Sequence, residues 1–164
     1  MAQFLASLTA TQIVDGLSSG ELALDDVVTA LRNQHQAVNG DINAFEFTAG
    51  QIGGGSPGRL HGLPVTVKDQ ISVAGMPISY GLDRAGRKTP AEAAPVVQGF
   101  LDAGANVWGK TTLPPYAMDF QTFNARIGKT CNPWNTEYTA GGSSGGGAAA
   151  VATGMSYLLS LIHI

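Results

Sequence analysis

The sequence is poor in charged residues and in the residue types that bind metals or form disulfides. Of its 164 residues 13% are charged, and it has one cysteine, Cys131, and three histidines. A single cysteine excludes an intramolecular disulfide. The lack of disulfides is typical of proteins from a reducing compartment. His35 and His61 have no partner residue at metal-ligand spacing. We therefore expect neither a metal nor another cofactor.

The chain also lacks any concentration of positive charge and any long apolar run. Nine Lys and Arg residues are dispersed along the chain among twelve Asp and Glu, for a net charge of −3. This argues against nucleic acid or an anionic membrane as a partner. No uncharged apolar segment approaches the roughly 18 residues of a membrane-spanning helix, and residues 1–8 lack the basic segment of a secretory signal. These absences predict a cytoplasmic protein.

Hydrophobic residues, at 44%, and 22 glycines are what the sequence has in quantity. Hydrophobic spacing predicts two helices within residues 9–38. The first helix is expected to begin with Thr9 or Thr11 as its N-cap and to end at Gly20. A strand over residues 63–69, a helix over 95–103 and a strand over 105–109 then form a βαβ unit. Such a unit predicts an α/β fold with a parallel sheet. Residues 113–139 are expected to be irregular because three prolines interrupt them.

Lys68 is the first residue that could carry chemistry. It ends the apolar strand, with Thr66 on its side of the strand and Val65 and Val67 on the other. A charged amine is costly to bury, so Lys68 must reach solvent, pair with a carboxylate such as that of Asp69, or lower its pKa. Taken alone, the first two alternatives are the simpler ones.

The second candidate is the segment Gly141 to Gly147, with the sequence GGSSGGG. As a phosphate loop it lacks the expected lysine. As a nucleophile elbow around Ser143 or Ser144 it needs a preceding strand, although residues 132–140 make a poor one, and a later histidine, for which only His163 is available. A third interpretation joins the two candidates, since a neutral lysine can activate one serine through another. A flexible turn is the plain alternative.

Four ordered motifs in this sequence closely resemble the amidase signature family. They are GLPVTVKD at residues 62–69, GKTTLP at 109–114, N-x-x-x-G-x-x-x-NPW at 124–134, and AGGSSGG at 140–146. Four motifs in order are far more specific than any one of them. The resemblance covers most of the chain, and it implies a mixed or parallel sheet flanked by helices, incomplete in this chain, and hydrolysis of carboxamides.

The resemblance also implies roles for individual residues. Lys68 corresponds to the general base of a Ser-cisSer-Lys triad, and Ser143 to the bridging serine that follows a cis peptide bond and relays protons. Gly141, Gly142 and Ser144 would shape the loop and the substrate site. Cys131 corresponds to no catalytic position and is expected to be an ordinary loop cysteine.

The third member of the triad, the nucleophilic serine, is not present among these residues. In the family it ends a segment of the form G-[ST]-D-x-G-G-S, and motif spacing would place it near position 167, whereas the sequence departs from that pattern from about residue 160. We therefore expect residues 1–164 to be the N-terminal portion of a single amidase-signature domain. This fragment is expected to have a non-native tail and to be inactive by itself.

The expected partner is a small-molecule amide substrate, and the full-length form is expected as a homodimer. The alternatives are an amidotransferase A subunit that works on misacylated tRNA, a Ser-His-Asp hydrolase, and a non-catalytic module in which GGSSGGG binds an anion.

Overall fold

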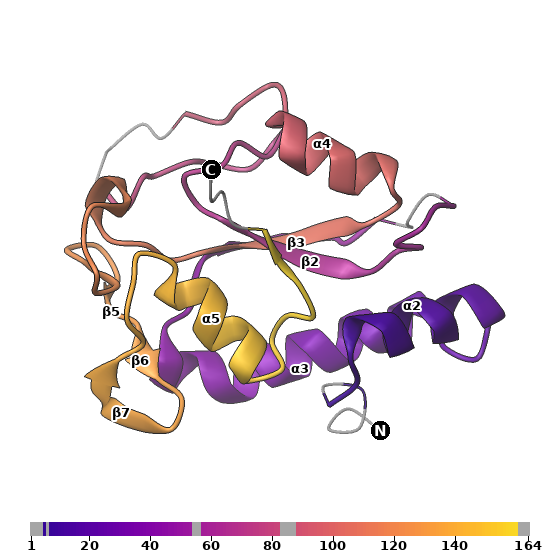
Figure 1. Ribbon diagram of the computed structural model, residues 1–164, viewed down its shortest axis with the longest axis horizontal. Coiled ribbons are helices and arrows are strands. Elements are labelled where there is room, and N and C mark those ends of the chain that lie inside the picture. The colour runs from indigo at the N-terminus through magenta and orange to yellow at the C-terminus, as the bar shows by residue number, and fades with distance from the viewer. Residues whose placement is uncertain (1–4, 6, 54–56, 83–87, 161–164) are drawn as a thin grey trace.

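The computed structural model describes residues 5, 7–53, 57–82 and 88–160 of the chain. The tail over residues 161–164, where the sequence predicts a departure from the family pattern, lies outside the described residues, as does His163. Within the described part, the elements form three layers, with a sheet between helices (Figure 1).

The sheet has four strands in the order β1-β3-β2-β8. β2 (Pro64–Lys68) pairs in parallel with β3 (Asn106–Thr111) on one side and with β8 (Leu159–Ser160) on the other, whereas β1 (Phe45–Thr48) pairs antiparallel with β3. The helix α4 (Pro95–Asp102) connects β2 to β3, so the predicted βαβ unit is confirmed. The sheet is mixed rather than parallel because β1, which hydrophobic spacing did not predict, runs the other way.

The two N-terminal helices follow the predicted signals. α2 (Ala10–Ser19) begins with a capping box between Thr9 and Gln12 and ends at Gly20, whose φ of +78° is the left-handed conformation that glycine adopts readily. α3 (Leu24–Ile42) runs four residues beyond the predicted segment. Both helices contribute to the core, where Ile13, Val27 and Leu31 are fully buried.

The core lies on both faces of the sheet. On one face Val67 of β2 packs against Val97 of α4. On the other face Leu31 of α3 and Trp108 of β3 pack with Ala149 and other residues of α5 (Gly145–Ala152). Figure 1 shows α4 alone on the first face and α2, α3 and α5 together on the second.

The segment after β3 contains more structure than its prolines suggest. A short 3-10 helix, η1 (Pro115–Ala117), precedes two hairpins, which are formed by β4 (Phe123–Asn124) with β5 (Gly128–Lys129) and by β6 (Cys131–Asn132) with β7 (Asn135–Thr139). The prediction of a poor strand over residues 132–140 was therefore wrong. β7 is exposed along most of its length, so its sequence is polar and does not show the pattern of a core strand.

Candidate active site

Lys68 is the last residue of β2 and lies inside the protein. Its alternation with Val67 turns it away from α4 and toward the loop that precedes α5. Only 5% of its surface is exposed. Its Nζ donates hydrogen bonds to Ser143 Oγ at 2.8 Å and to Ser144 Oγ at 2.9 Å. The fold thus joins the two sites that the third interpretation of the sequence connects.

No carboxylate among the described residues lies within 4.0 Å of Lys68 Nζ. Neither plain alternative from the sequence, solvent exposure or pairing with Asp69, is observed. Burial lowers the pKa of Lys68 below its usual range, because the charged amine is separated from water. This is the direction that a general base near neutral pH requires.

The serine loop has a backbone that glycine makes possible. Gly141 has a φ of +78°, and the peptide bond between Gly142 and Ser143 is cis, as the family resemblance implies. A side chain at position 142 would approach the backbone of Phe120 and Gln121 to 2.9 Å. The first amide of α5, that of Gly145, donates to Thr122 Oγ1 at 2.9 Å. These contacts fix the loop against the segment that carries Phe120 and Thr122.

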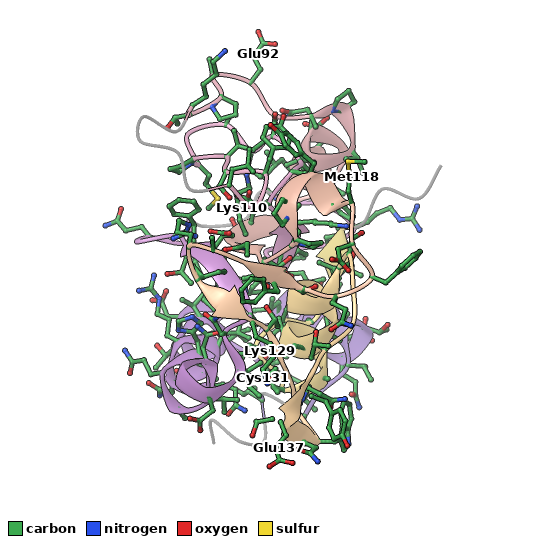
Figure 2. All side chains as sticks on the ribbon, turned by 90° about the vertical axis from the view of Figure 1, so that its left-hand side faces the viewer. Glu92, Lys110, Met118, Lys129, Cys131 and Glu137 are labelled. Carbon is green, nitrogen blue, oxygen red and sulfur yellow. The ribbon has the colours of Figure 1, made fainter. Side chains whose placement is uncertain are left out.

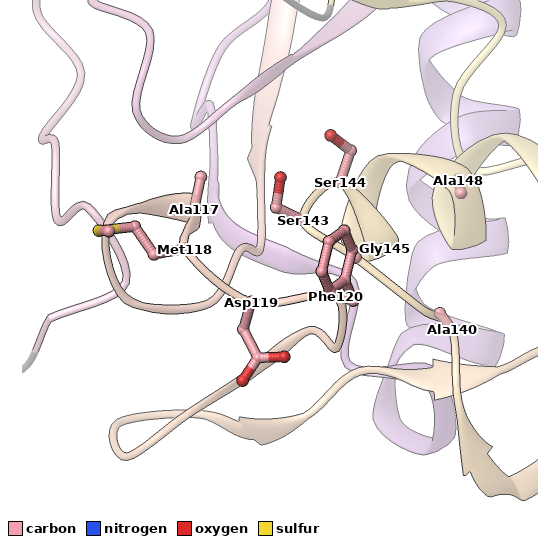
Figure 3. A pocket seen from close by; sticks show the side chains of 10 residues that line it. Ala117, Met118, Asp119, Phe120, Ala140, Ser143, Ser144, Gly145 and Ala148 are labelled. Carbon is pink, nitrogen blue, oxygen red and sulfur yellow. The ribbon is translucent and has the colours of Figure 1, made fainter.

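A pocket of about 610 Å³ opens in front of the two serines (Figure 3). Its wall is formed by the end of η1 and the residues after it, by the serine loop and by the start of α5. The apolar side chains in this wall are those of Ala117, Met118, Phe120, Ala140 and Ala148. In Figure 3 the carboxylate of Asp119 points away from the serine hydroxyls, and it accepts a hydrogen bond from the Gln121 amide at 2.9 Å. Lys68 is not among the described residues that line the pocket. Its amine is connected to the pocket by its hydrogen bonds to the two serine hydroxyls, which do line it.

Asp69 has a different partner from the one that its position suggests. Its Oδ1 lies 3.4 Å from Nζ of Lys110, and both side chains are fully buried. Its Oδ2 accepts hydrogen bonds from the backbone amides of Ser79 and Tyr80 and from the Ser79 hydroxyl. Sequence reasoning missed Lys110, although the GKTTLP motif contains it, because nothing local indicates that this lysine is buried.

A second buried network holds the segment that forms the pocket wall. Asn124 Nδ2 donates to Glu46 Oε1 at 3.3 Å and to the Leu113 carbonyl at 3.1 Å. Arg126 forms an ion pair with Glu46, whose side chain is fully buried. This network ties the 113–130 segment to β1, and sequence reasoning had assigned Asn124 only as part of a motif.

The other residue types considered from the sequence lie away from the pocket. Cys131 is half-buried on β6, and His35 packs edge-on against Phe45 and Trp108 in the core, with ring centroids 5.0 and 5.7 Å away. No histidine lines the pocket within the described ranges, so the geometry of a Ser-His-Asp site is absent there. The described residues also contain no group of three metal-ligand side chains and no helix long and apolar enough to cross a bilayer.

Comparisons with known proteins show the family to which the chain is related. The amidase family model matches residues 27–159. The acylamidase of Rhodococcus erythropolis is 34% identical in an alignment 166 positions long, and the alignment covers 93% of this chain and 35% of that protein. The A subunit of glutamyl-tRNA(Gln) amidotransferase from Carboxydothermus hydrogenoformans is 34% identical in an alignment 160 positions long, and the alignment covers 90% of this chain and 33% of that protein.

The fold gives the same result. The crystal structure of the corresponding glutamyl-tRNA(Gln) amidotransferase A subunit from Thermotoga maritima superposes with a TM-score of 0.80 at 26% identity, covering 93% of this chain and 33% of that one. This chain therefore spans about a third of the length of these relatives. The family model covers most of its residues, and the fold is that of the same enzymes, so the chain belongs to the amidase family.

Proposed function

We propose that this chain supplies the general base and the proton relay of an enzyme that hydrolyses the C–N bond of carboxamides. The observation that supports the proposal is the buried amine of Lys68, which has no carboxylate within reach in the described structure and hydrogen-bonds to Ser143 and Ser144. Membership of the amidase family and relatives named acylamidase agree with this chemistry.

We infer a separate role for each of the two serines. A neutral lysine amine has one lone pair and two N–H groups. In the proposed mechanism the lone pair accepts a proton from the hydroxyl of Ser143, while one N–H donates to Ser144 Oγ and fixes the orientation of the amine. Ser143 in turn takes the proton of the nucleophile. Ser144 therefore positions the base rather than relaying protons.

The reaction then proceeds by acyl transfer. The nucleophilic serine attacks the amide carbon, and its proton passes through Ser143 to Lys68. Lys68 returns that proton by the same route to the departing amine, which leaves an acyl ester that water hydrolyses. The family resemblance assigns the nucleophile to a G-[ST]-D-x-G-G-S segment, and the 164 residues contain no such segment. We therefore expect no amide hydrolysis by a polypeptide of these residues alone.

The pocket wall bears on the substrate. Its apolar side chains include Met118 and Phe120, which are 84% and 90% exposed and so are available to a ligand. Burial of apolar area stabilises an uncharged acyl or aryl group there. We propose apolar carboxamides as the substrate class.

The test begins by sequencing the gene onward from about codon 160, where motif spacing predicts the departure from the family pattern. The complete open reading frame is then expressed. Release of ammonia from acetamide and benzamide is then measured. We expect Lys68→Met and Ser143→Ala to lower kcat/KM by about 10²–10⁴-fold, the usual contribution of acid–base catalysis. Ser144→Ala should lower it less, and the exposed Lys88→Met serves as the control. Turnover by the 164-residue chain that is lost in Lys68→Ala would contradict the assignment of the nucleophile.

A second candidate in the same family is an amidotransferase A subunit. Relatives of that name are as similar to this chain as the acylamidase is, at 34% identity. In both candidates water takes the acyl group of the cleaved amide. They differ in what becomes of the released ammonia, which leaves in one and is transferred to a misacylated tRNA in the other. Glutamine hydrolysis that is coupled to amide formation on tRNA in the presence of partner subunits would favour the second candidate.

A further inference from the structure

Asp69 follows Lys68 directly, yet the two side chains have separate partners. Lys68 turns toward the serine loop, whereas Asp69 Oδ2 accepts three hydrogen bonds of 2.8–2.9 Å from the turn at Ser79 and Tyr80. Asp69 is fully buried, so its carboxylate acts on its surroundings with little screening by water.

Lys110 approaches this carboxylate from the neighbouring strand. Its Nζ lies 3.4 Å from Asp69 Oδ1 and donates to the Pro77 carbonyl at 3.1 Å. In Figure 2 it lies in the middle of the molecule, far from the end marked by Glu137. Burial lowers the pKa of Lys110, and the charge and hydrogen bonding of Asp69 act against that change.

The strand register makes the three residues neighbours in the structure, with the Lys68 side chain on one face of the sheet and those of Asp69 and Lys110 on the other. Lys110 of β3 is opposite Val67 of β2, and Thr111 is opposite Lys68. A carboxylate close to a lysine favours the charged amine, which cannot accept a proton. Asp69 without a counter-charge would therefore oppose the function proposed for Lys68. A bound cation cancels most of that effect.

We propose that Lys110 is a positioning residue. It binds Asp69 on the face of β2 opposite the serine loop and cancels the charge of that carboxylate, so that Lys68 can be the neutral base of the serine relay. The proposal rests on the function proposed above for its purpose, whereas the contacts between Lys110 and Asp69 are independent of that function. It gives a role to the lysine of the GKTTLP motif, which the Lys68–serine site does not use.

The other described groups around Lys68 leave this pair as the main source of charge. α5 and β8 contribute no titratable side chain to it. Asp119 points away from the serines (Figure 3). Tyr80 is 40% exposed, and its backbone amide donates a hydrogen bond to Asp69. Glu46 is paired with Arg126 beyond β3.

The first experiment needs no substitution in the protein that is measured. Lysines carrying ¹³C at Cε are titrated by NMR in the 164-residue chain, and single Lys→Met variants assign the signals of Lys68, Lys88, Lys110 and Lys129. We expect Lys68 to lose its proton at a lower pH than Lys110. Deprotonation of Lys110 first, or of both at the same pH, would overturn the proposal.

Three variants then test the cause. Lys110→Met should move the titration midpoint of Lys68 to higher pH, because Asp69 is left without its cation. Asp69→Asn should move it to lower pH, because the charge of Lys110 is left uncancelled. The double variant should return it close to the wild-type value, and Lys129→Met serves as the control. An unchanged midpoint in folded Lys110→Met contradicts the proposal, and if that variant does not unfold cooperatively in urea, the wild-type order of titration decides.

These measurements separate the inference from the proposed function. Amide hydrolysis by the full reading frame without any of these shifts would overturn the role of Lys110 alone. The shifts without amide hydrolysis would overturn the proposed function and leave the interaction between Lys110 and Lys68 in place.

Discussion

At the scale of single residues, the burial of Lys68 makes the stability of the fold depend on pH. Because burial lowers its folded-state pKa below the ordinary 10.5, the unfolded chain binds more protons between the two values, and stability rises with pH in that window. We expect the wild type to gain stability relative to Lys68→Met as the pH is raised from neutral toward 10.5. Urea unfolding at several pH values measures this gain. The control variant Lys88→Met keeps Lys68 and should therefore keep the gain.

The residues of the site could be predicted only in part from the sequence. Lys68 and Ser143 were identified because their motifs resemble a family, and the structure places them 2.8 Å apart. The role of Lys110 could not be predicted, because a lysine is ordinarily exposed. Its burial depends on Asp69, which is 41 positions earlier in the sequence and is brought to it only by the pairing of β2 with β3.

At the scale of elements, close packing of α5 against the sheet depends on its glycines. A side chain at position 146 would collide with Thr112 and approach the Ala44 carbonyl to 2.7 Å. We expect Gly146→Ala to destabilise the fold by about 1–3 kcal/mol, the usual cost of overpacking. The matched control is Gly99→Ala in α4, where the added methyl group meets nothing within 4 Å. It should stabilise the fold by about 0.5–1 kcal/mol, because alanine favours helix.

Both variants are compared by their urea unfolding midpoints. Equal effects of the two substitutions would show that helix propensity, rather than contact with Thr112 and Ala44, determines the result at position 146.

The elements that the sequence predicted are those with strong local signals. The capping box of α2 and the βαβ unit belong to this group. β1 and β8 were missed because each is short and is stabilised by strand neighbours distant in the sequence. β7 was missed because an exposed polar hairpin has no hydrophobic alternation.

At the scale of the whole molecule, Tyr157 connects the two ends of the described chain. Its hydroxyl donates to the Leu5 carbonyl at 3.0 Å, and burial raises its pKa from 10.0 to about 12. Because the folded-state value is the higher one, this contribution to stability is complete below pH 10 and is lost as the pH rises to 12. We expect Tyr157→Phe to unfold about 0.5–1.5 kcal/mol more easily at neutral pH, the worth of one hydrogen bond.

The alkaline range distinguishes this hydrogen bond from simple packing. Between pH 10 and 12 the difference between the wild type and Tyr157→Phe should shrink. Thermal melts across that range measure it, and a difference that does not change with pH would show that the hydroxyl has the same pKa in the folded and unfolded chains.

The distance in sequence between Lys68 and its serines has a consequence for how the protein is made. They are separated by 75 and 76 positions, so they meet only after a long loop has closed, and contacts of this kind form slowly. On the ribosome, Lys68 emerges well before Ser143 has been translated, and until then its amine has no hydroxyl to bind. In the nascent chain Lys68 is therefore an ordinary lysine. It can act as a base only after folding has brought the serine loop to it.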